Sequence, residues 1–149
     1  RDPAPVVAIA GSGPSFLQLT RQISELDAPV LLLGHRTDVA DLLRSADVAV
    51  MTSVWEGQPL FPQEALRSGV PLVATRAGGL PDVVGDGAVL VDVGDVDAVD
   101  AQVRALLDDP AHRAEVVARG LVRAAALPTE ADELAQVRAV YAELLGRAP

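Results

Sequence analysis

The sequence contains no cysteine among its 149 residues, and aromatic residues make up only 3% of it. The absence of cysteine excludes disulfides, thiol catalysis and thiolate zinc sites, and it is compatible with a reducing cytoplasm. Because aromatic side chains are scarce, the core must be built from valine, leucine and alanine. The valine-rich runs favour strands, and the whole composition is typical of an α/β protein.

Positive charge is also scarce, because 12 basic residues stand against 21 acidic ones, for a net charge of −9. Such a chain repels a phosphate backbone at long range, so we expect no nucleic acid partner. No apolar run reaches the roughly 18 residues of a transmembrane segment, and no positively charged, cleavable leader is present. We therefore expect a soluble, cytoplasmic protein, and leave open a peripheral association with the inner membrane through a further domain.

Five short apolar runs end at glycine or at small polar residues, and we expect each to be a strand buried on both faces. They cover residues 6–11, 30–34, 48–53, 71–79 and 88–94. Apolar residues at helical spacing lie between them, for example Phe16, Leu19, Ile23 and Leu26. The alternation predicts an α/β fold with a parallel sheet and right-handed crossovers.

The last third of the sequence is predicted to be helical. Apolar residues recur at helical spacing from Val96 to Leu107, and Asp109-Pro110 starts a second helix, because proline is tolerated in a first turn. Thr129 and Asp132 have the spacing of a capping box for a third helix. Since no repeat or linker interrupts the chain, we predict one domain over residues 1–149.

Four loops directly follow predicted strands, at residues 11–15, 34–38, 53–60 and 75–82. Ligands of open parallel sheets bind outside the carboxyl ends of the strands, so we expect these loops to converge on one edge. The glycine-rich first loop could hold a phosphate at a helix start. However, Phe16 stands where the NAD-binding fingerprint has its third glycine, and a tight turn is the simpler interpretation.

Two carboxylates, Glu56 and Glu64, flank a Gly/Pro bend in the third of these loops. An ionised carboxylate can accept hydrogen bonds from both hydroxyls of a ribose, and Glu64 could do so from a helix that begins near Leu60. Glu56 could face a sugar hydroxyl or the positive charge that develops on a sugar carbon. Spacing alone leaves open that both are solvated surface residues.

Other candidate sites are weaker. Asp95 and Asp97 have the Asp-x-Asp form of a metal site, but they open a helix, where aspartate favours the helix dipole. His35 and His112 are single histidines without further ligands at suitable spacing. We predict no metal site.

Residues 34–91 resemble the donor-binding domain of retaining nucleotide-sugar glycosyltransferases of family 4 (glycosyl transferase group 1). The most specific features are Glu56 and Glu64 with seven residues between them, followed by "SGVPLVAT" and "GGLPD" at the expected distances. The resemblance continues through residues 95–116 to Tyr141. It implies a Rossmann-like parallel sheet flanked by helices, as the C-terminal domain of a two-domain GT-B enzyme.

The resemblance also implies roles for individual residues. Glu64 would bind the ribose diol, and Glu56 would contact the donor sugar or stabilise the transition state. The base would lie near Arg36 and Val39. Sugar and phosphate oxygens would meet backbone groups from Gly57, Gln58, Leu60 and Phe61. The donor would be a UDP-, GDP- or ADP-sugar, the acceptor a hydroxyl of a sugar, a lipid-linked group or a small molecule, and no cofactor is implied.

The sequence departs from the family pattern at several points. Pro59 stands where the family usually has glycine, which removes a backbone N–H, and Asp82 replaces the commoner glutamate. The strand–helix unit that carries a basic Arg/Lys pair is absent, as is the acceptor-binding domain. We therefore expect a part of a longer enzyme that is inactive alone. A noncatalytic nucleotide-sugar binding module and an epimerase-like domain remain alternatives.

Overall fold

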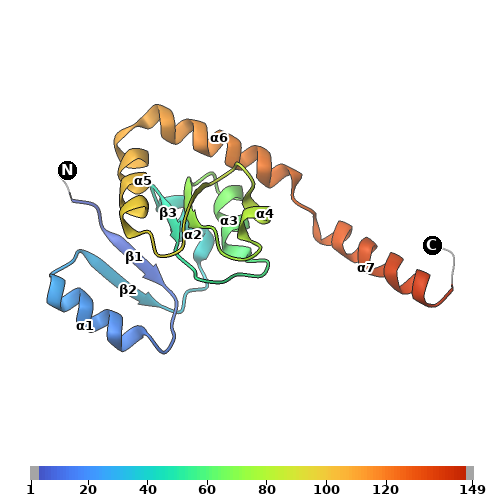
Figure 1. Ribbon diagram of the computed structural model, residues 1–149, viewed down its shortest axis with the longest axis horizontal. Coiled ribbons are helices and arrows are strands. Elements are labelled where there is room, and N and C mark those ends of the chain that lie inside the picture. Colours follow the sequence, from blue (N-terminus) through green and yellow to red (C-terminus); the bar gives the residue numbers. More distant parts are fainter. Residues whose placement is uncertain (1–3, 147–149) are drawn as a thin grey trace. The chain divides into compact units, whose positions relative to one another are not determined.

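The computed structural model describes residues 4–146, and the chain divides into two compact units, one ending at Asp41 and the other beginning at Leu42. Strands and helices alternate along the chain until the last three helices, which follow one another directly (Figure 1). Unit 1 contains β1 (Val7–Ala10), α1 (Phe16–Leu26) and β2 (Val30–Gly34), and ends inside α2 (Val39–Ser45). Unit 2 contains β3 (Ala49–Met51), α3 (Leu60–Arg67), β4 (Leu72–Thr75), α4 (Leu80–Val84), β5 (Val89–Val91), α5 (Val96–Asp108), α6 (Pro110–Ala126) and α7 (Glu130–Leu144).

All strand pairs are parallel, as the sequence predicts. In unit 1, β1 pairs with β2, and in unit 2 the order is β3-β4-β5, so that Val73 of β4 lies opposite Val50 on one side and Val89 on the other. The hydrogen-bonded strands thus form two groups, where the sequence led us to expect one sheet. Consecutive strands need not be neighbours in a parallel sheet, and β2 and β3 do not pair.

The strands of the two units differ in burial. Each residue of β4 is buried, whereas most of β1 is exposed and β2 is at best half-buried. The expectation that every strand is buried on both faces is therefore wrong for unit 1, and also for β3 of unit 2, where Val50 is exposed. The physical reason in unit 1 is that a pair of strands with α1 as its one complete helix cannot cover two faces.

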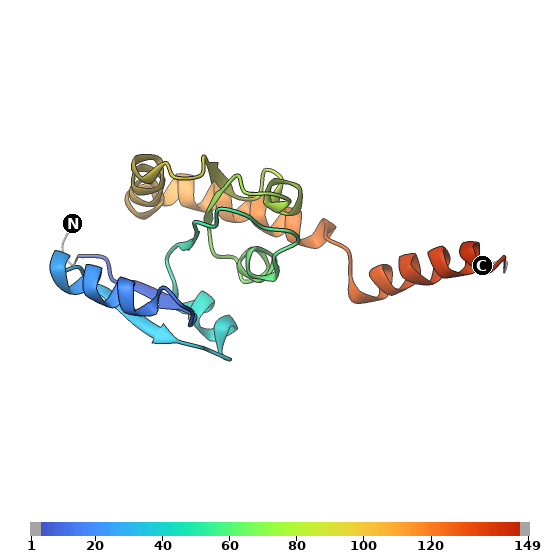
Figure 2. The same cartoon turned by 60° about the horizontal axis from the view of Figure 1, so that its bottom comes forward.

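The hydrophobic core of unit 2 lies between its sheet and the helices that follow it. Val73, Val91, Leu106 and Val116 form a buried cluster that joins β4, β5, α5 and α6. Helix α5 packs against β4 and β5, and α6 packs against α3 and α5, an arrangement that Figure 2 shows from a second side. Valine and leucine thus build the core, as the scarcity of aromatic residues requires.

The helix starts predicted from the sequence are confirmed. The Asp95 side chain accepts a hydrogen bond from the backbone N–H of Ala98, and Asp109 precedes a helix whose first residue is Pro110. Thr129 and Asp132 form a capping box at the start of α7. Helix α4 was not predicted, since its five residues are too few to show a helical period.

Helix α7, the last of the predicted helices, does not contribute to the core of unit 2. It has no buried residue, and its apolar side chains are exposed. Over residues 4–146, no helix combines the length and the apolar character that crossing a bilayer requires.

Candidate functional site

The loop between β3 and α3 carries the two candidate carboxylates. Glu56 is half-buried in this loop, and Glu64 is exposed in the second turn of α3. Neither carboxylate has a hydrogen-bond or ion-pair partner among the described residues. Both can therefore accept hydrogen bonds from a ligand without breaking an existing contact.

The loops after β3 and β4 meet at the carboxyl edge of the sheet, as predicted. The hydroxyl of Thr75 donates a hydrogen bond to the carbonyl oxygen of Ser53 (2.5 Å), and the backbone N–H of Gly79 donates to the carbonyl oxygen of Glu56 (2.9 Å). In unit 1 the start of the loop after β1 is bound to the end of β2, since the N–H of Gly11 donates to the carbonyl oxygen of Gly34 (2.7 Å).

Helix α3 begins without a side-chain cap. Its N-cap residue is Pro59, which has an extended backbone (φ −70°, ψ 141°) and no hydroxyl, amide or carboxylate to offer. Proline also occupies position 62, so the first turn presents the N–H groups of Leu60 and Phe61 at the positive end of the helix dipole. These are two of the residues whose backbone groups the sequence assigned to the ligand.

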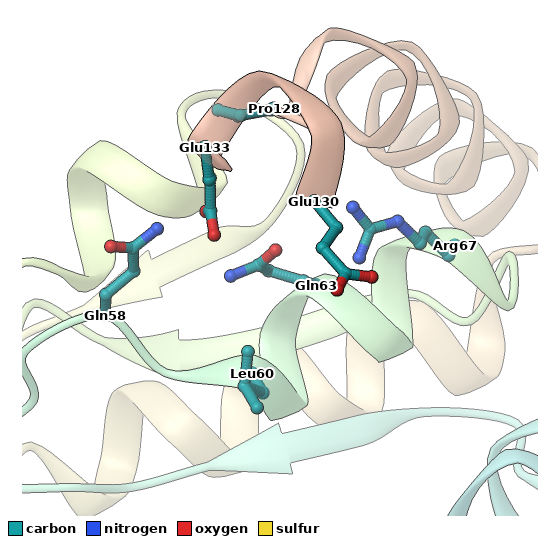
Figure 3. A pocket seen from close by; sticks show the side chains of 7 residues that line it. All are labelled: Gln58, Leu60, Gln63, Arg67, Pro128, Glu130 and Glu133. Carbon is teal, nitrogen blue, oxygen red and sulfur yellow. The ribbon is translucent and has the colours of Figure 1, made fainter. Parts of the chain in front are cut away.

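A hollow of about 460 Å³ lies between α3 and the start of α7 within unit 2. Figure 3 shows Leu60, Gln63 and Arg67 projecting from α3, with Glu130 and Glu133 reaching toward them from α7. Gln58 and Pro128 complete the lining. Of the predicted site residues the hollow includes Gln58 and Leu60, and it includes neither Glu56 nor Glu64.

The sequence did not point to several of these lining residues. Gln63 is 8% exposed and donates a hydrogen bond from its amide to the carbonyl oxygen of Pro59 (3.3 Å). The spacing of Leu60, Gln63 and Arg67 by three and four residues is a signal that they share one helix face. No such signal connects them with Glu130 and Glu133, because their place across the hollow depends on the path of the chain after α6.

The remaining predicted site residues, Arg36 and Val39, belong to unit 1. The Arg36 guanidinium donates two hydrogen bonds to the carboxylate of Asp38, at 2.8 and 2.5 Å. These bonds raise the pKa of Arg36 and lower the pKa of Asp38. Arg36 is thus already paired, and Val39 is the half-buried first residue of α2.

A second hollow, of about 240 Å³, lies in unit 1 beside the glycine-rich loop. Its lining includes Gly11, Gly13, Phe16, Leu19 and Leu32. Ser12 and Ser15 of the loop also line it, and no basic side chain is among the lining residues. Among residues 4–146, no three histidine, cysteine or acidic side chains gather as a metal site would require.

Comparisons with known proteins were made for sequence and for structure. A family model described as glycosyl transferases group 1 matches residues 2–109. The MMP alpha-(1->4)-mannosyltransferase of Mycolicibacterium hassiacum is 42% identical over 113 residues, which are 74% of this chain and 28% of that protein. The N-acetyl-alpha-D-glucosaminyl L-malate synthase of Bacillus anthracis is 38% identical over 111 residues, or 70% of this chain and 29% of that protein. The chain therefore spans less than a third of either relative.

A solved structure shows the same fold. The crystal structure of HepE from Anabaena in complex with UDP-glucose matches with a TM-score of 0.76 and 25% identity, over 82% of this chain and 36% of that one. The Rossmann-like α/β fold with parallel strands, predicted from the sequence, is thereby confirmed.

Proposed function

Because the chain belongs to the glycosyl transferases group 1 family, we propose that it is the donor-binding part of a retaining glycosyltransferase. The enzyme would transfer a sugar from a nucleoside diphosphate sugar to a hydroxyl acceptor. The names of two relatives support a sugar donor, since one is a mannosyltransferase and the other was crystallised with UDP-glucose. This chain's own donor sugar, base and acceptor are left open by the proposal.

The observation that carries the proposal is the grouping of Glu56 with the uncapped start of α3 at the carboxyl edge of one sheet. Glu64, one turn further along α3, would accept hydrogen bonds from the two ribose hydroxyls. The N–H groups of Leu60 and Phe61 would donate to phosphate or sugar oxygens. Glu56 would contact the donor sugar and stabilise the positive charge that develops as the sugar leaves. Gly57 and Gln58 would line the path between them.

Arg36 and Val39 would border the base from unit 1. The guanidinium of Arg36 is paired with the carboxylate of Asp38. We therefore propose that Arg36 contacts the base either through its backbone or through guanidinium N–H groups that Asp38 does not bind. Hydrogen-bond recognition of the base would then fall mainly to backbone groups of the loop after β2.

The strand pairing supports the view that one strand–helix unit of the donor domain precedes this chain. In the common doubly wound order 3-2-1-4-5-6, strands 2 and 3 pair with each other, as do strands 4, 5 and 6 in sequence. The pairs β1-β2 and β3-β4-β5 reproduce these two groups without strand 1. An acceptor-binding domain in the longer protein would complete the enzyme, and the 149-residue chain alone would not turn over.

The proposal is tested by measuring nucleotide affinity in the longer protein that contains this chain. Ligand-observed NMR against UDP-, GDP- and ADP-sugars identifies the donor, and calorimetry then compares the wild type with E64A and E64Q. We expect E64A to weaken binding about 10- to 100-fold, because two hydroxyls lose a charged acceptor. E64Q, which accepts with one oxygen, should fall between.

Glu143 offers a matched control, because it is an exposed glutamate on α7. E143A should bind the nucleotide like the wild type. Unchanged affinity in E64A would reject the ribose assignment. Nucleotide binding without any sugar transfer would favour a noncatalytic binding module, and interconversion of the donor sugar without an acceptor would favour an epimerase.

A further inference from the structure

Two neighbouring glycines in the loop after β4 lie directly against the backbone of the loop that carries Glu56. The N–H of Gly79 donates a hydrogen bond to the carbonyl oxygen of Glu56 (2.9 Å). A methyl carbon at Gly78 would overlap that same oxygen, and one at Gly79 would overlap the carbonyl oxygen of Gly57. The distances from the added carbon to these oxygens would both be well under 3.0 Å, whereas real Cβ atoms essentially never lie within 3.0 Å of an atom elsewhere in the chain. Neither position can therefore carry a side chain while the two loops stay where they are.

The two glycines are required for different reasons. Gly78 has a φ of +52°, a left-handed conformation that side chains other than glycine rarely adopt. Gly79 has a φ of −81°, which any residue adopts without strain. The need for glycine at position 79 is thus purely steric. The methyl group of an alanine there would clash with the carbonyl group of Gly57, and apart from its chain neighbours no other group of residues 4–146 lies within 4 Å of it.

A second anchor holds the other end of the same loop. Thr75 is 2% exposed, and its hydroxyl donates a hydrogen bond to the carbonyl oxygen of Ser53 (2.5 Å). Between the two anchors, Val54 and Trp55 are 80% and 75% exposed. The loop is therefore fixed by its backbone at Ser53 and Glu56, with little support from packing of its own side chains.

We propose that Gly78 and Gly79 are positioning residues. Because they carry no side chain, the backbone of Glu56 can lie directly against the loop after β4, and this contact determines the position of Glu56. This inference rests on the proposed function, because it matters for the reaction only if Glu56 faces the donor sugar. The two glycines touch the backbone of Glu56 and Gly57, so their effect on the sugar acts through Glu56. Glu64 and the N–H groups of Leu60 and Phe61 lie outside this contact. A side chain at either glycine therefore does not push directly against the groups assigned to the ribose and to the start of α3.

The test is G79A in the longer protein, with steady-state kinetics and calorimetry. A misplacement of about 1 Å at a reacting group can cost about 100-fold in rate, so we expect kcat to fall about 10- to 100-fold. The Kd for the nucleotide should stay within about threefold of the wild type, because G79A removes no charged contact to the nucleotide. The loss of one such contact would raise the Kd about tenfold.

The matched control is G120A, which also crowds a glycine contact in unit 2. A methyl group at Gly120 would lie 3.1 Å from Cδ2 of Leu66 and 3.2 Å from the carbonyl oxygen of Gly87, in the core rather than at the loops. G120A should leave kcat unchanged, whatever its effect on the unfolding midpoint. If G79A, like G120A, leaves kcat unchanged, the positioning role is overturned.

A second pair of variants covers the case in which G79A does not fold. T75V removes the anchor at Ser53 without adding volume, and T75S restores its hydroxyl. We expect a lower kcat in T75V and recovery in T75S. Equal kcat in both would overturn the inference that the backbone contacts of this loop position Glu56.

A wild-type enzyme without sugar transfer would instead reject the proposed function. The contact would then be judged from the amide chemical shifts of residues 56–58, which must move in G79A if the contact positions this loop.

Discussion

The hydroxyl of Thr75, at the end of β4, donates a 2.5 Å hydrogen bond to the carbonyl oxygen of Ser53 in the loop after β3. Valine has no hydroxyl, so T75V would leave that carbonyl without its donor, and the site of the lost hydroxyl is buried from water. We predict that T75V lowers the free energy of unfolding by about 1 to 3 kcal/mol, measured by urea denaturation. T75S keeps the hydroxyl and should lose much less. Equal losses in the two variants would mean that the bond does not stabilise the fold.

Arg123 ties α6 to the end of α4. Its guanidinium donates hydrogen bonds to the carbonyl oxygens of Val83 (2.9 Å) and Asp82 (2.5 Å), which the helix leaves unpaired. We predict that R123A costs about 1 to 2 kcal/mol, since a charged donor is lost at a partly exposed place. R123K should recover only part of this, because an ammonium group cannot make the paired contact.

The control for Arg123 is Arg104, which pairs with Asp100 on the exposed surface of α5. R104K should leave the unfolding midpoint nearly unchanged in the same urea experiment. A loss in R104K as large as that in R123K would mean that the exchange of arginine for lysine itself, and not the contact with α4, explains the result.

Asp109 makes the stability of α6 depend on pH. Its carboxylate accepts hydrogen bonds from the N–H groups of His112 (3.0 Å) and Ala111 (2.9 Å), and these bonds lower the pKa of Asp109 below its ordinary value of 3.8. A carboxyl whose pKa is lowered by folding stabilises the protein above its unfolded pKa, and the contribution is lost as the pH falls through the folded pKa.

D109N keeps an acceptor at this N-cap but does not titrate. We therefore predict that the wild type loses more stability than D109N when the pH falls from neutral to below 3.8, and that the two are similar at neutral pH. Urea midpoints at both pH values measure the difference. Parallel losses in the two proteins would show that this cap does not titrate with folding.

Trp55 is the single tryptophan of the chain and is 75% exposed. Because its ring buries little surface, we predict that W55A changes the free energy of unfolding by less than about 0.5 kcal/mol, measured by circular dichroism. The fluorescence of the wild-type chain should have the long-wavelength maximum of a solvated indole and be quenched readily by acrylamide. A protected, short-wavelength emission would mean that the loop after β3 folds over its own side chain.

The elements of the fold were largely readable from local sequence. Each of the five valine-rich runs forms a strand, and Asp95, Asp109 and Thr129 begin helices as predicted, because caps and apolar periodicity act within a few residues. The grouping of the strands was not readable, because pairing joins residues far apart in sequence, such as Val50 with Val73. The exposure of β1 and of α7 likewise depends on which partners are near, and no local pattern reports this.

For the candidate site, the sequence by itself determined which groups are available: two carboxylates with seven residues between them, a Gly/Pro bend, and a helix start without a capping side chain. Spacing on α3 is fixed by the geometry of one helix, so these features follow from residue order. Only the tertiary structure decided that Gly78 and Gly79 lie against the backbone of Glu56, and that Glu130 and Glu133 face α3 across a hollow. Such contacts form when the packing of helices and strands brings separate loops together. They cannot be predicted from the sequence, because no short-range periodicity or propensity encodes the distance between those loops.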